Sequence, residues 1–230
     1  MIVTSDQFQE ARVHWGESQK NIHKSISNRG GIYITQGFIG ANKQGQTTTL
    51  GREGSDYSAA ILAWSVNANK VVIWKDVLGL LNADPKIFKN TEQLYQISFK
   101  EAIELSYLGA SVIHPKTVKP LQNKCIPLII RSFLKQNSKG SIIGNLGKND
   151  RDIPSFIFKP NQLLISISTK DYSFIFEDHI SELFQLFADF GLKVHLMQNS
   201  ALNFSICGHI KSPLLPKLLS SLKEKYLVRY

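Results

Sequence analysis

Helical and strand patterns alternate along the first two thirds of this 230-residue chain, and this alternation restricts the fold more than any other feature. Residues 56–68 are apolar-rich with a helical pattern, and residues 70–75 (Lys-Val-Val-Ile-Trp-Lys) are typical of a short buried strand. A second helix is expected from Ser98, which opens a capping box, to a stop at Gly109. A further strand is expected over residues 127–133. This order predicts an α/β fold whose sheet has parallel members.

Further elements are expected around this frame. Residues 31–39 (Gly-Ile-Tyr-Ile-Thr-Gln-Gly-Phe-Ile) are rich in branched and aromatic side chains and predict a buried strand. Residues 47–50 predict a second strand, after a turn at residues 42–45. His114 precedes another helix, which has Pro115 in its first turn.

The polar, glycine-bearing segment 134–152 predicts a domain boundary. After it the pattern restarts as strand, helix, two strands and helix, and a last strand begins at Tyr226. The β-α-β-β-α order predicts a ferredoxin-like α+β unit that lacks its final strand. We therefore expect one domain over residues 1–145, a linker over 146–155 and a second, incomplete domain over 156–230.

Composition argues against several classes of protein. The longest apolar runs, such as residues 127–130, are too short to cross a membrane, and the first residues do not resemble a signal peptide. Cys125 and Cys207 are isolated, which indicates reduced thiols, a cytoplasmic location and no zinc site. The net charge of +9 comes from singly spread lysines without interleaved aromatic residues, so we expect neither a nucleic-acid nor a membrane partner.

The segment 47–58 (Thr-Thr-Thr-Leu-Gly-Arg-Glu-Gly-Ser-Asp-Tyr-Ser) carries the clearest chemical signal. The glycines on either side of Arg52 let the backbone approach a ligand, and the arginine offers a planar fork for a carboxylate or phosphate. Ser55 or Asp56 is expected to cap a helix whose free N–H groups face the same place. The motif alone also fits a plain hairpin before a helix, with a solvated arginine, so both interpretations stay open.

Four segments in series resemble aspartate kinase, a member of the amino acid kinase superfamily. These segments are residues 37–40 with 47–58, residues 74–85, residues 98–110, and residues 109–117. They extend across residues 30–143, and the remainder resembles the regulatory ACT module of the family. The resemblance implies the C-terminal portion of an amino acid kinase α/β sandwich, followed by an ACT domain.

The resemblance implies that the loop around Arg52 binds L-aspartate. Thr49, Arg52 and Ser55 would hold the substrate, with Arg52 on its α-carboxylate, because a buried bidentate ion pair suits arginine better than lysine. Asp56 is interpreted either as the helix cap or as a further substrate contact.

The resemblance also implies an ATP site in the segments that follow. The candidate residues are Lys75, Asp76, Gly79, Lys86, Ser111 and Lys116. Lys75 ends a strand, where open α/β sheets place their ligands, and Lys86 stands where the family has an arginine that reaches ATP. Ser111 replaces the lysine of the family's Gly-Ala-Lys, so Lys116 either supplies that charge or lies in solvent. His114 is interpreted as structural.

The implied reaction transfers the γ-phosphoryl group of ATP to the β-carboxylate of L-aspartate, giving 4-phospho-L-aspartate for lysine, threonine and methionine biosynthesis. Such chemistry relies on positioning, Mg²⁺ and positive charge, which fits a chain without a visible nucleophile or metal cluster. The family's initial Lys-x-Gly-Gly turn and its catalytic lysine do not appear, and residues 1–13 resemble an internal stretch of the kinase domain. We therefore expect a fragment with no catalytic residue and no kinase activity of its own.

In the ACT-like part, Asn199 and Ser200 stand where the family's effector-binding groups lie. His195 stands where lysine-inhibited relatives carry an acidic residue, and a neutral imidazole is a poor partner for an ammonium group. We therefore expect threonine or no effector, and a homodimer formed through the edges of the unfinished sheet. Two alternatives remain: a non-catalytic ACT-containing regulatory subunit with a remnant kinase lobe, or an amino acid kinase for another substrate, such as glutamate.

Overall fold

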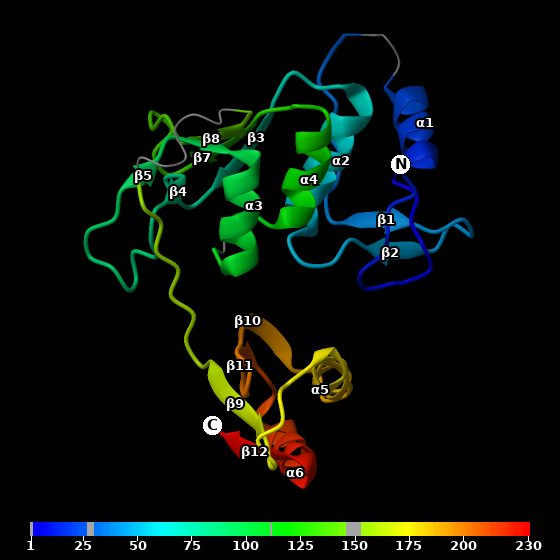
Figure 1. The fold of residues 1–230 in the computed structure, drawn as a ribbon. Helices are drawn as coiled ribbons and strands as arrows, with labels where there is room; N and C mark the ends of the chain where they lie inside the picture. Colours follow the sequence, from blue (N-terminus) through cyan, green and yellow to red (C-terminus); the bar gives the residue numbers. More distant parts are fainter. Residues whose placement is uncertain (1, 27–29, 111, 146–152) are drawn as a thin grey trace. The chain divides into compact units, whose positions relative to one another are not determined.

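The computed structural model describes residues 2–26, 30–110, 112–145 and 153–230, and Figure 1 traces them along the chain. The chain divides into two compact units, Met1–Phe158 and Lys159–Tyr230, each with its own apolar core. Residues 146–152, which make up most of the predicted linker, lie outside the described residues. The division falls between Phe158 and Lys159.

The first unit contains a mixed sheet covered by helices. Its described helices are α1 (Trp15–Ser25), α2 (Gly54–Val66), α3 (Phe99–Leu108) and α4 (Pro115–Asn123). Its described strands are β1 (Ile39–Ala41), β2 (Thr47–Thr49), β3 (Val71–Lys75), β4 (Leu80–Leu81), β5 (Gln93–Leu94), β6 (Gln96–Ser98), β7 (Leu128–Ser132) and β8 (Ser141–Gly144).

The main sheet has the order β3-β7-β8-β6. Strands β3 and β7 are parallel, with Val71 opposite Leu128, which confirms the expected α/β fold with parallel members. Strand β8 runs antiparallel to β7 and parallel to β6. The sequence does not predict β8, because its Ile142-Ile143 pair is the only apolar signal between polar flanks. Helix α4 packs against both α2 and α3, and Figure 1 shows these three helices side by side.

Side-chain caps fix the starts of α3 and α4. The Ser98 hydroxyl accepts a hydrogen bond from the Glu101 N–H at 3.0 Å, and α3 stops at Gly109, whose φ is 131°. His114 Nδ1 accepts from the Lys116 N–H at 3.1 Å and so caps α4. Both predicted helix starts are confirmed, and so is the structural role of His114.

The predicted buried strand over residues 31–39 is wrong apart from its last residue. Strand β1 begins at Ile39 and pairs antiparallel with β2, whereas residues 31–37 are irregular. Ile32 and Ile34 are 93% and 95% exposed. An apolar pattern reports a tendency to be buried, but a strand also needs a backbone partner, and no described strand pairs with residues 31–37.

The second unit is a four-stranded antiparallel sheet with two long helices. Its elements are β9 (Leu163–Thr169), α5 (Glu177–Asp189), β10 (Lys193–Asn199), β11 (Asn203–His209), a short 3₁₀ turn (Ser212–Leu214), α6 (Leu215–Lys225) and β12 (Tyr226–Arg229). The strand order β10-β11-β9-β12 is ferredoxin-like.

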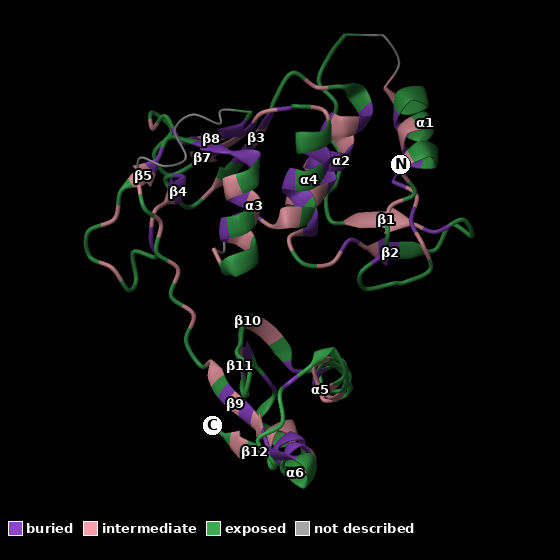
Figure 2. Cartoon of the chain, viewed as in Figure 1, coloured by how far each residue is buried: buried purple, intermediate pink, exposed green. Residues whose placement is uncertain are grey.

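The last strand begins at Tyr226, as expected, but the expectation that the unit lacks its final member is wrong. Strand β12 pairs with β9, and Leu227 lies opposite Ser168. Four residues suffice because they alternate: Tyr226 and Val228 pack toward the core, while Leu227 and Arg229 are exposed. Figure 2 shows the same alternation of buried and less buried residues along β9. Among the described helices, none is long and apolar enough to cross a membrane.

Candidate functional site

The loop before α2 is shaped by two backbone conformations that few residues adopt. Gly51 has a φ of 79°, and Glu53 is left-handed with a φ of 54°. The Gly54 N–H donates to the Gly51 carbonyl at 3.0 Å, so the chain already turns into the helix at Gly54. The prediction that Ser55 or Asp56 caps α2 is therefore wrong: Glu53 is the N-cap residue and makes no side-chain cap hydrogen bond.

The three predicted aspartate-binding residues lie in or beside this loop with different surroundings. Arg52 is exposed, and no ion pair holds its guanidinium within the part of the chain that the structure describes. Ser55 is exposed on the first turn of α2, close beneath Gly37, where a Cβ would lie 3.2 Å from the Ser55 Cα. The Thr49 hydroxyl donates to the carbonyls of Phe8 and Gln9, at 3.1 and 2.8 Å. It therefore holds the N-terminal segment that contains these two residues against β2.

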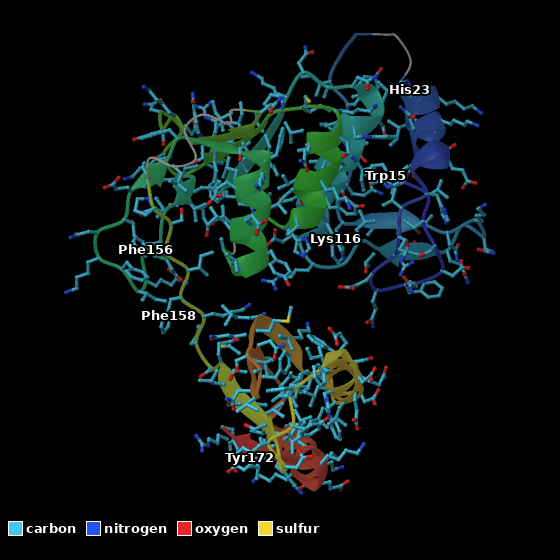
Figure 3. The ribbon with its side chains drawn as sticks, viewed as in Figure 1. Trp15, His23, Lys116, Phe156, Phe158 and Tyr172 are labelled. Carbon is cyan, nitrogen blue, oxygen red and sulfur yellow. The ribbon has the colours of Figure 1, made fainter. Side chains whose placement is uncertain are left out.

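Charged groups gather around His114, at the start of α4. Burial lowers the pKa of His114; the positive charges of Lys116 and Arg52 lower it further, and the carboxylates of Glu53 and Glu10 oppose them. Each of these four charged groups therefore lies within electrostatic reach of His114, Lys116 and Arg52 among them. Figure 3 labels Lys116 at this end of α4.

Lys75 connects this loop to the end of β3. Its ammonium pairs with Asp56 at 2.8 Å and donates to the Val112 carbonyl, and both side chains of the ion pair are less than a quarter exposed. Asp56 is thus the anionic partner of a lysine on the sheet, which explains its place in the first turn of α2. Asp76, the next residue after Lys75, is exposed.

A cavity of about 250 Å³ lies on the other side of the turn that follows β3. One wall is the segment from Gly79 to Lys86, and another is formed by Gly109, Ala110 and Val112. The cavity therefore brings together Gly79 and Lys86 of the predicted ATP-binding residues. Lys75, Asp76 and Lys116 do not line it, and Ser111 lies outside the described residues.

The turn at Gly79 depends on the absence of a side chain. Gly79 has a φ of 148°, and a Cβ on it would lie 2.4 Å from Ser141 Oγ. The same hydroxyl accepts from the Leu80 N–H at 2.8 Å, so Ser141 supports the turn from β8. A wider, more open hollow lies beside Leu78 and residues 133–138, and it contains none of the predicted residues.

Sequence reasoning missed the third wall of the cavity. Ser155, Phe156, Ile157 and Phe158 complete the lining, although the first of them falls in the predicted linker and the others in the predicted second domain. The signal in the sequence is the pair of aromatic residues Phe156 and Phe158, spaced by two, just after the predicted linker.

In the second unit, the predicted effector residues lie where β10 ends. Asn199 is exposed, and Ser200 forms the turn into β11, with its hydroxyl donating to the Asn203 carbonyl at 3.2 Å. Lys159 Nζ lies 3.3 Å from His195 Nδ1, so the ring already has an ammonium group of the chain beside it, and the expectation about the effector stays a prediction. Burial, followed by the charge of Lys159, lowers the pKa of His195, so the neutral ring accepts this bond.

The chain belongs to the amino acid kinase family, whose sequence model matches residues 1–132. Several curated relatives to which it is similar are aspartokinases. It is 33% identical over 217 residues to the bifunctional aspartokinase/homoserine dehydrogenase of Buchnera aphidicola, and this match covers 91% of the chain but 26% of the relative.

Two solved structures of E. coli aspartokinase III are also similar. The T-state complex with lysine and aspartate has a TM-score of 0.82 at 29% identity, over 99% of this chain and 52% of that one. The R-state complex with aspartate and ADP has a TM-score of 0.76 at 29% identity, over 99% and 53%. The chain therefore spans little more than half the length of these solved chains.

Proposed function

We propose that this chain carries part of an aspartate kinase site, which transfers the γ-phosphoryl group of ATP to the β-carboxylate of L-aspartate. The observation that carries the proposal is the cavity that gathers Gly79, Lys86 and Val112. Lys75 connects Val112 to Asp56, in the helical turn that follows the Arg52 loop. The solved relative that holds aspartate and ADP together supports this choice of ligands.

In this proposal Arg52 binds the α-carboxylate of aspartate, since its planar guanidinium is exposed and free of an ion pair among the described residues. Thr49, before the loop, and Ser55, after it, contact the aspartate from either side. Lys116, which like Arg52 lies within electrostatic reach of His114, adds positive charge toward which phosphate oxygens are drawn. Positive charge and positioning are what phosphoryl transfer requires of the protein.

The nucleotide is bound by the segment after β3. Lys86 and Gly79 contact ATP from the cavity wall, and Asp76, which follows β3, is a further contact. Ser111 keeps its predicted role as an ATP-binding residue. Mg²⁺ enters as part of the Mg·ATP substrate. The described residues include no group of three or more His, Cys, Asp or Glu side chains that could hold an ion, and kinase Mg²⁺ relies largely on substrate phosphates.

Calorimetric titration of the chain with Mg·ATP tests the nucleotide part. We expect Lys86→Ala to weaken binding about tenfold, which corresponds to about 1.4 kcal/mol for a charge-assisted hydrogen bond. Lys89→Ala is the matched control, because Lys89 is an exposed lysine of the same segment that does not line the cavity. Equal affinities of the wild type and Lys86→Ala would contradict the assignment of Lys86.

The second unit is proposed to bind an amino acid effector near Asn199 and Ser200 and to form a homodimer through the edges of its sheet, β10 and β12. The solved relative that contains lysine supports an amino acid as the effector class. Titration with lysine and with threonine, followed by amide NMR shifts at these two residues, tests the effector. Analytical ultracentrifugation tests the dimer, and a monomer at high concentration would contradict it.

A further inference from the structure

The segment from Ile153 to Phe158, called the strap below, is held against the loop after β4 by main-chain bonds. The Phe156 N–H donates to the Asn82 carbonyl at 2.6 Å, and Ala83 and Phe156 form a parallel β-bridge. The Asn82 side chain donates in turn to the Pro154 carbonyl at 3.2 Å. The strap therefore has a fixed backbone position in the first unit.

The side chains of the strap alternate in their surroundings. Ile153 and Ile157 pack on the apolar core of the first unit. Phe156 and Phe158 are instead 52% and 57% exposed, although both line the cavity. Figure 3 labels both rings on the strap. Two large apolar rings on a cavity wall, on a backbone that is already fixed, are typical of a ligand site.

The cavity is suited to one part of a nucleotide. Its volume of about 250 Å³ is below that of pockets for whole drug-sized ligands, so it fits a base with little else. Its walls are mostly apolar, with Leu81, Pro85 and Val112 among them, while Lys86 supplies a cation at the rim. An apolar slot beside a cation matches a flat base joined to a phosphate chain.

The Phe156 ring is itself supported from one side. The Phe88 ring lies 6.2 Å from it between centroids, at an interplanar angle of 32°. Phe88 does not line the cavity, so it supports Phe156 from the neighbouring loop. A ring held in this way loses little freedom when a base stacks on it.

We propose that the strap is the base-binding wall of the nucleotide site, with Phe156 and Phe158 stacking on or flanking the base of ATP. This inference rests on the proposed function. It assigns a binding role to the segment that directly precedes the second unit, which begins at Lys159. Stacking recognises the π-face that every base has, so these residues set affinity for the base and leave the phosphates to Lys86.

The test compares two probes in calorimetric titrations with Mg²⁺ present: ADP, and inorganic tripolyphosphate, which has no base. We expect Phe156→Ala and Phe158→Ala each to weaken ADP about tenfold and to leave tripolyphosphate unchanged. Phe156→Tyr should restore ADP binding, because the ring is kept. Phe133→Ala is the matched control, since Phe133 is 51% exposed in the same unit but lies outside this cavity.

A second measurement does not depend on the variants folding well: ADP should slow amide exchange in residues 153–158 of the wild-type chain, and tripolyphosphate should not. Unchanged ADP affinity in both alanine variants, or an equal loss of tripolyphosphate binding, would overturn the strap assignment and leave the proposed function standing. If the wild type binds tripolyphosphate but not ADP, the base wall is overturned. If it binds neither, the nucleotide part of the proposed function fails as well.

Discussion

At the scale of single residues, Lys75 joins three parts of the first unit. Its ammonium bonds to Asp56 on α2 and to the Val112 carbonyl in the turn before α4. Both partners are largely buried, so removal of one charge leaves the other poorly compensated. We expect Lys75→Met and Asp56→Asn to be non-additive by about 1 kcal/mol in the free energy of unfolding. Urea titration of the two single variants and the double variant measures this coupling, and additive effects would contradict it.

His114 is the residue whose titration should be visible in stability. Its folded pKa lies below its ordinary value of 6.5, chiefly because of burial, and its Nδ1 accepts the cap hydrogen bond only when unprotonated. The unfolded chain therefore binds the proton more readily. The stabilisation is complete above the unfolded pKa and is lost as the pH falls through the folded pKa.

We therefore expect wild type to lose stability relative to His114→Asn between about pH 7 and pH 5, since asparagine can cap the helix without titrating. Urea unfolding followed by tryptophan fluorescence measures this difference. His195→Asn in the second unit is the control, and it should leave the pH dependence of the first unit unchanged. Parallel pH profiles for wild type and His114→Asn would contradict the assignment.

At the scale of elements, the turn between β3 and β4 depends on Gly79. A Cβ there would meet Ser141 Oγ at 2.4 Å in a backbone conformation that side chains rarely adopt. We expect Gly79→Ala to lower the free energy of unfolding by about 2–4 kcal/mol. Gly45→Ala is the control, because Gly45 also has a positive φ but has open space around it. Its loss of stability therefore measures only the cost of the unfavourable backbone conformation. Equal losses in the two variants would show that the contact with Ser141 costs nothing.

The sequence predicts those elements whose signal is local. Ser98 and His114 cap helices with their own side chains, so the starts of α3 and α4 can be read from a few adjacent residues. The start of α2 could not be read in this way, because the turn from Gly51 to Gly54 sets it through the backbone, upstream of the residues that favour caps. The start of a helix can therefore be predicted from the local sequence more accurately when a side chain caps it than when a backbone turn sets it.

Elements that depend on distant partners were the ones missed. Residues 31–37 have the composition of a strand but belong to none of the described sheets, whereas β8 has a weak pattern and gains its place from β7 and β6. The candidate site shows the same contrast between local signals and distant partners. Gly79 and Lys86 were proposed because the sequence around them resembles aspartate kinase, but Phe156 reaches the same cavity across 70 or more positions of sequence.

At the scale of the whole molecule, the two apolar cores permit a test of how far the units depend on each other. Leu183 is fully buried in the core of the second unit, on α5. All three tryptophans, Trp15, Trp64 and Trp74, lie in the first unit. Tryptophan fluorescence therefore reports the first unit alone, while amide exchange along β9 reports the second.

We expect Leu183→Ala to destabilise the second unit by about 2–5 kcal/mol, because the lost contacts leave a cavity in a closed core. Amide exchange along β9 should speed up, while the urea midpoint seen by tryptophan fluorescence should stay unchanged. Leu164→Ala is the control, since Leu164 lies on β9 with 62% of its side chain exposed and should change neither measurement appreciably. An equal shift of the tryptophan transition in Leu183→Ala would mean that the two cores unfold as one cooperative system, because damage to one would then be felt fully by the other.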